Sequence, residues 1–162
     1  MLTSFSAARP MRSLGAFCFF LMLIVSWDSR AQQVIDQREL ENIKVGEVVR
    51  LNGLLKKPAG TVCVLYPYQT SLHEKGSLGR QINTHLEAVN YSADEGHWAF
   101  VFVDGDNVSV QRFRRSERLD IRSGHESLPL GFRPLNCTTV AQAGVAKVQV
   151  SNRNYLVLGE IQ

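Results

Sequence analysis

A long β-prone run followed by a tight turn is the feature of this sequence that most constrains its fold. Residues 98–103 (WAFVFV) are aromatic, β-branched or small, and residues 104–107 (DGDN) have the composition of a turn. Residues 108–113 (VSVQRF) then return with alternating apolar and polar side chains. Pattern and turn chemistry together predict a β-hairpin over residues 98–113.

Two earlier segments have the same character. Residues 45–53 are rich in β-branched side chains and end on the turn dipeptide Asn52-Gly53, which predicts a strand running into a tight turn. Residues 61–66 are apolar on both faces, as expected of a central strand. Regular structure is expected to begin at Val45, after an N-terminal arm over residues 32–44 that is either frayed or a short helix.

The C-terminal third contains one long loop and one further hairpin. Residues 123–134 contain prolines and glycines that argue against long regular structure. Strands are predicted over residues 145–151 and 155–161, joined by a turn at residues 152–154. This last hairpin follows closely after Cys137.

One helix is predicted, over residues 78–88. Its apolar side chains fall at spacings of four, four and three, and Ser77 is placed to cap its start. Gly79 weakens the helix by about 1 kcal/mol relative to alanine. The apolar face that would pack against a sheet consists of Leu78, Ile82, Leu86 and Val89.

These elements predict a mainly β fold with one helix. The sequence contains no internal repeat and no linker-like segment, so residues 45–162 are expected to form a single domain. With 44% hydrophobic and 20% charged residues, the composition is too apolar for a disordered chain. A small antiparallel β-sandwich or a partly open barrel with one disulfide fits this pattern.

Residues 1–31 have the pattern of a secretory signal peptide, in which a short positive region precedes an apolar run over residues 14–27. Small residues near Ala31 place the expected cleavage after it. The run is shorter than the roughly 20 residues that a membrane-spanning helix needs, which disfavours an uncleaved anchor. We therefore expect a periplasmic or secreted chain of residues 32–162.

Cleavage would leave a nearly neutral chain. It removes three of the 18 basic and one of the 15 acidic residues. Because a global argument for nucleic-acid binding needs a strong positive excess, no nucleic-acid partner is expected.

Cys63 and Cys137 are the two cysteines of this mature chain, and an even count in an exported protein predicts a disulfide. Closing a loop of about 75 residues stabilises the fold by roughly 4 kcal/mol in the chain-entropy model. The alternative is two buried free thiols. Pairing would remove the candidate thiol nucleophiles and so disfavours a cysteine hydrolase.

No local motif of covalent catalysis or phosphate binding occurs in the sequence, which lowers the expectation of an enzyme. No pair of the four histidines is closer than twelve residues, so neither a metal site nor another cofactor is expected. His97 follows Asp94 and Glu95, and His125 precedes Glu126. Either histidine could serve acid–base catalysis in a hydrolase, although a solvated surface position is favoured.

The most distinctive charged segment carries Arg112, Arg114, Arg115, Arg118 and Arg122. Such a segment can bind an acidic partner or an anionic surface, or it can guard a solvated edge strand. Aromatic residues at strand ends, namely Tyr66, Tyr68 and Trp98, can likewise form a binding surface or fill the end of the core. The candidate binding residues are thus Tyr66, Tyr68, Trp98, Arg112, Arg114, Arg115 and Arg118.

The sequence as a whole favours an exported binding protein. We expect an accessory, inhibitor or immunity-type factor that recognises another envelope or secreted protein. One alternative is a secreted hydrolase using His97 or His125 with a nearby carboxylate. Another is an envelope component that binds anionic lipid or glycan through residues 112–122. No segment resembles a known family closely enough to name one, and the oligomeric state is left open.

Overall fold

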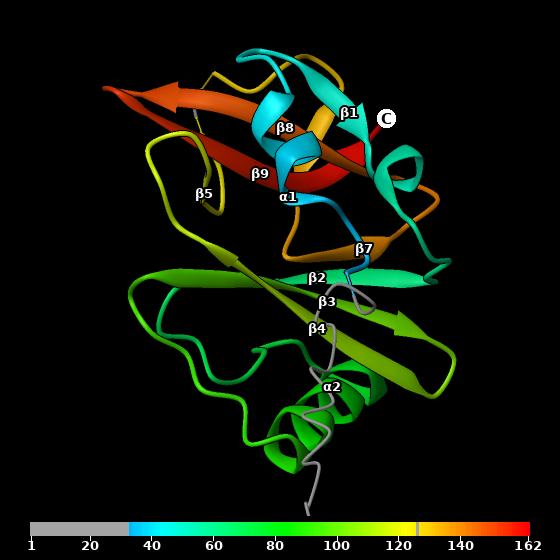
Figure 1. Cartoon of the computed structure of the whole chain (residues 1–162). Coiled ribbons are helices and arrows are strands. Elements are labelled where there is room, and N and C mark those ends of the chain that lie inside the picture. The colour runs from blue at the N-terminus through cyan, green and yellow to red at the C-terminus, as the bar shows by residue number, and fades with distance from the viewer. Residues whose placement is uncertain (1–32, 126) are drawn as a thin grey trace, which may run out of the picture.

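The computed structural model describes residues 33–125 and 127–162 as two β-sheets packed face to face, with the longer helix outside one of them (Figure 1). The predicted signal peptide over residues 1–31 lies outside the described residues. Among the described residues, no helix has the length and apolar character needed to cross a membrane.

The first sheet contains the predicted hairpin and the predicted central strand. Its strands follow the order β4-β3-β2-β7, and every neighbouring pair is antiparallel. The hairpin turn consists of two residues, because Asp104 pairs with Asn107. The strand bounds are β2 Thr61–Leu65, β3 His97–Asp104, β4 Asn107–Arg114 and β7 Cys137–Thr139.

The second sheet is built around the predicted C-terminal hairpin. Its strands follow the order β1-β8-β9-β5, and β6 also pairs with β9. All pairs are antiparallel except the two-residue pairing of β5 with β9. The bounds are β1 Val48–Arg50, β5 Asp120–Ile121, β6 Phe132–Pro134, β8 Ala143–Val150 and β9 Arg153–Ile161. The two sheets do not close on each other, so the sandwich is confirmed and the barrel is not.

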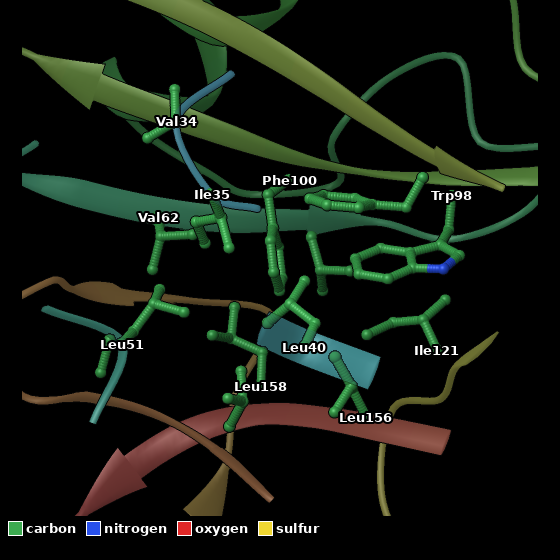
Figure 2. Packing of buried hydrophobic residues seen from close by; sticks show 14 of the residues in the cluster. Val34, Ile35, Leu40, Leu51, Val62, Trp98, Phe100, Ile121, Leu156 and Leu158 are labelled. Carbon is green, nitrogen blue, oxygen red and sulfur yellow. The ribbon is translucent and has the colours of Figure 1, made fainter. Parts of the chain in front are cut away.

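Large aromatic and aliphatic side chains fill the space between the sheets. Alternation along β3 directs Trp98, Phe100 and Phe102 inward, and Trp98 stacks on Phe113 with ring centroids 4.4 Å apart. Figure 2 shows this layer facing Leu158 and its neighbours from β9. Burial of this apolar surface is the main source of stability.

The predicted helix covers the outer face of the first sheet. Helix α2 spans Ser77–Ala88 and packs Ile82 and Leu86 against the odd-numbered side chains of β3, including Val101. Ser77 is the first residue of the helix rather than its cap. Gly76, with φ of 91°, precedes it and makes no side-chain cap.

The N-terminal arm enters the core, so ordered structure begins earlier than Val45. Helix α1 spans Gln37–Asn42, and Ile35 and Leu40, both fully buried, lie between the sheets (Figure 2). The amide side chain of Gln111 on β4 bonds the backbone of Val34 and Ile35. The short-helix alternative for the arm therefore holds.

Two local expectations differ from the structure. Asn52 and Gly53 do not form a hairpin turn, because residues Leu51–Leu54 form the 3₁₀ helix η2. The predicted loop over residues 123–134 ends in β6, which continues the second sheet. Short-range sequence signals do not reveal the pairing of β6 with β9, which is distant in the sequence.

The predicted disulfide joins Cys63 on β2 to Cys137 on β7, which are directly opposite each other in the antiparallel pair. Strand β7 is short and lies at the edge of the first sheet. The disulfide therefore attaches the segment that leads into the C-terminal hairpin of the second sheet to β2, a central strand of the first sheet.

Candidate binding site

Three of the predicted binding residues lie at one end of the first sheet. Arg112 is on β4, Arg115 follows the end of β4, and Tyr68 lies in the turn after β2. Since β2, β3 and β4 are neighbours, the loops at this end come together. The loop before β3 supplies the Asp94 carboxylate that Arg112 contacts and the Glu95 backbone oxygen that Arg115 contacts.

Asp94, in that loop, is the centre of the first group of charges. Its Oδ1 accepts hydrogen bonds from the Gly96 amide and from His97 Nδ1, both at 2.8 Å, and its Oδ2 accepts one from Arg112 at 2.5 Å. The hydrogen bond from His97 is the largest of the effects that lower the pKa of the Asp94 carboxyl below its ordinary 3.8. Asp94 is therefore ionised at neutral pH and holds Arg112 in one orientation.

Arg115 is fixed by a second carboxylate beneath the surface. Its guanidinium donates to both oxygens of Asp120, at 2.7 and 2.9 Å, and to the backbone oxygen of Glu95 at 2.9 Å. The Asp120 side chain is fully buried and also accepts a hydrogen bond from Arg153 at 2.8 Å. Burial raises the pKa of Asp120, but the two arginines together lower it below its ordinary value.

Tyr68 is the most exposed aromatic side chain in this region, with 67% of its surface accessible. It follows Pro67 in a turn in which the Gln69 amide donates to the Tyr66 carbonyl, and its φ is 66°. The pKa of the Tyr68 hydroxyl is raised, mainly by partial desolvation and to a smaller extent by a hydrogen bond with Glu95. The turn thus directs a large aromatic ring away from the core and beside the carboxylates.

We call this set of residues the tyrosine–arginine face. Tyr91 belongs to it because it lies within electrostatic range of both Arg112 and Asp94. Tyr91 also lines an adjoining cavity of about 520 Å³ between α2 and the segment after the Tyr68 turn. The face comprises Tyr68, Tyr91, Asp94, Glu95, His97, Arg112 and Arg115.

Of the other predicted binding residues, Arg114 lies beside this face, and the rest lie outside it or below the surface. Arg114 and Arg118 are exposed, and Arg114 pairs with His97 across the hairpin. The hydroxyl of Tyr66, which is half-buried, donates to Asn136 at 3.0 Å. Trp98 is fully buried. It therefore fills the core, which was the alternative to a binding surface, and offers no surface to a partner.

The two histidines considered for catalysis are not brought together. His97 bonds Asp94, whereas His125 Nδ1 accepts a hydrogen bond from the Ser127 amide. His125 lines a different cavity, with Arg122 and Val150. Within residues 33–125 and 127–162, no group of three or more histidine, cysteine or acidic side chains could hold a metal ion.

The chain matches no protein-family model, no curated protein and no solved structure.

Sequence reasoning did not identify Tyr91 or the contact of Arg153 with Asp120. Tyr91 had no distinguishing neighbour in the sequence, and Arg153 lies 33 residues from Asp120. Within the arginine-rich segment, Asp120 pairs with Arg115. The run of alternating arginines and acids was the available signal for that contact.

Proposed function

We propose that this chain is an exported binding protein that recognises another envelope or secreted protein through the tyrosine–arginine face. The observation that carries the proposal is the convergence of exposed Tyr68 with Arg112 and Arg115, both held by carboxylates. Tyrosine and arginine are the residue types that most often dominate binding energy in protein interfaces. Side chains already held in place lose less conformational entropy when a partner binds.

Export is supported by two features. The first 31 residues have the pattern of a signal peptide, and Cys63 is bonded to Cys137. Disulfides persist in the periplasm and outside the cell and are rare in the cytosol. An accessory, inhibitor or immunity-type role is consistent with a face that is built for recognition and includes no recognised catalytic motif.

The test begins with retention of a partner from an envelope extract on the immobilised protein and identification of that partner. Its dissociation constant is then measured with the purified partner for Tyr68→Ala and Arg112→Ala. We expect each variant to weaken binding about 10-fold or more, as for interface hot spots. Matched controls are Leu130→Ala and Arg50→Ala, which remove exposed side chains outside the face. Equal affinity of the face variants and the controls would reject the proposed surface.

A second candidate function is hydrolysis, and one observation favours it. The 2.8 Å hydrogen bond between His97 Nδ1 and Asp94 orients the imidazole, and with Nδ1 as the donor its Nε2 can accept a proton from water. We rank this function second because Asp94 also binds Arg112 and, in the described part of the chain, no serine hydroxyl is hydrogen-bonded to His97.

Hydrolysis of p-nitrophenyl acetate separates the two candidates. A general base at His97 predicts that His97→Ala lowers the rate about 100-fold, with Asp94→Asn acting in the same direction. His73→Ala is the control, because His73 is exposed and outside the face. A rate that is the same for His97→Ala and the wild type eliminates this candidate.

Attachment to an anionic lipid or glycan has less support from the geometry. Arg112 and Arg115 are paired with Asp94 and Asp120, so Arg114 and Arg118 remain as the exposed arginines of this segment outside these ion pairs. Such attachment would weaken sharply with rising salt.

A further inference from the structure

Strand β4 lies at the open edge of the first sheet, and β3 is its only partner strand among the residues that the structure describes. The Arg115 amide donates to the Gly96 carbonyl at 2.8 Å, which fixes the alternation of the hairpin ladder. Odd-numbered residues of β4 therefore turn their backbone groups toward β3, and even-numbered residues turn theirs outward. The even-numbered residues are Val108, Val110, Arg112 and Arg114.

In the part of the chain that the structure describes, no hydrogen bond reaches these outward-facing groups. The arm does not cover them, because it contacts the Gln111 side chain on the inner face. An exposed row of backbone donors and acceptors of this kind is a template for another strand.

The charges at the two ends of β4 have opposite sign. Asp106 is exposed in the turn that begins the strand, and Arg114 is exposed at its end. Charges of one sign along an edge strand would repel a second copy of that strand. On β4 the charges of opposite sign at the two ends are complementary when a second copy runs antiparallel. A parallel pairing of two copies would place arginine beside arginine, and an antiparallel pairing places arginine beside aspartate.

We propose that β4 is the interface of a two-fold symmetric homodimer, in which two copies of β4 pair antiparallel about Val110. In this register Val110 is opposite its counterpart, Arg112 is opposite Val108, and Arg114 is opposite Asp106 of the other copy. The paired residues are all even-numbered, so the outward-facing backbone groups satisfy one another. The two first sheets then form one continuous sheet, and the interface is closed, as two-fold interfaces are.

The test measures the molar mass of the purified protein by sedimentation across a concentration series. We expect a dimer that Val110→Pro converts to monomer, because proline removes an N–H that points away from β3 and leaves the hairpin ladder intact. Circular dichroism verifies that the variant is folded. A protein that is monomeric throughout, or a dimer that folded Val110→Pro leaves unchanged, overturns the proposal.

Charge exchange tests the register independently of the proline variant. Asp106→Arg and Arg114→Asp are each expected to raise the dissociation constant of the dimer about 10-fold, and the double variant to restore it. Gly105 takes the positive φ of the turn, so Asp106 tolerates the change. Arg50→Asp, on the other sheet, is the control for charge alone. A double variant that dissociates at least as readily as either single variant overturns the antiparallel register.

Discussion

Asp120 joins the two sheets at the scale of single residues. It belongs to β5 of the second sheet, and its carboxylate binds Arg115 beyond the end of β4 in the first sheet and Arg153 of β9. The buried carboxylate also accepts a hydrogen bond from the Ile121 amide at 2.8 Å. A buried charge is tolerated only when its hydrogen bonds are made, so each of these partners is needed.

Replacing Asp120 by asparagine is expected to lower the free energy of unfolding by about 3 kcal/mol at neutral pH, because two arginines lose their buried counter-charge. Urea unfolding measures the change. Asp106→Asn is the matched control, since Asp106 is exposed and its replacement is expected to have little effect. Equal stabilities of the two variants would contradict the role given to Asp120.

The same residue predicts a pH dependence. The pKa of Asp120 is lower in the folded protein than its ordinary 3.8. The contribution of Asp120 to the free energy of unfolding is therefore complete above the ordinary pKa and is lost as the pH falls through the folded pKa. The stability difference between the wild type and Asp120→Asn should therefore be constant from neutral pH to about pH 5 and shrink below about pH 4. Urea unfolding at a series of pH values tests this, and a difference that stays constant into strong acid would count against it.

At the scale of elements, the N-terminal arm is held by two side chains from different sheets. Gln111 of β4 accepts hydrogen bonds from the Val34 and Ile35 amides and donates to the Ile35 carbonyl, at 2.6 to 2.9 Å. Lys147 of β8 donates to the Leu40 and Glu41 carbonyls at the end of α1. The arm thus behaves as part of the core.

Gln111→Leu keeps the side chain close to its original size but leaves three buried backbone groups without a partner. We expect a loss of about 3 kcal/mol in the free energy of unfolding. We also expect faster tryptic cleavage after Arg38, because the arm opens more often. Gln149→Leu, at an exposed position of β8, is the control. Unchanged cleavage at Arg38 would show that Gln111 does not hold the arm.

At the scale of the whole molecule, the disulfide links the two halves of the chain. Cys63 and Cys137 are 74 residues apart in the sequence. A bond across such a distance restricts the unfolded chain more than the folded one. Strand β7 gains the most from it, since this strand has three residues and one neighbour in its sheet.

Replacing both cysteines by alanine is expected to lower the free energy of unfolding by about 4 kcal/mol. The sandwich should still form, because both sheets retain their cores. Calorimetry of the double variant, beside the wild type with and without a reducing agent, measures this. A melting temperature equal to that of the oxidised wild type would contradict the prediction.

The two hairpins and α2 could be predicted from the sequence because their signals are local. Alternation, turn residues and helical spacing all lie within one element. The arm could not be placed, since the contact that fixes it joins Val34 to Gln111, 77 residues away. Trp98 illustrates the same limit, because its run of neighbours predicted a strand but did not reveal that Trp98 lies in the core between the two sheets.

The proposal that the tyrosine–arginine face binds a partner protein is tested most directly by hydrogen exchange of the complex. Backbone amides of residues 66–69, 91–97 and 112–115 should exchange more slowly when the identified partner is bound, because the partner excludes water from them. Residues 127–131, in the loop before β6 of the second sheet, should be unaffected. Slower exchange confined to residues 127–131, with the face unchanged, would contradict the account.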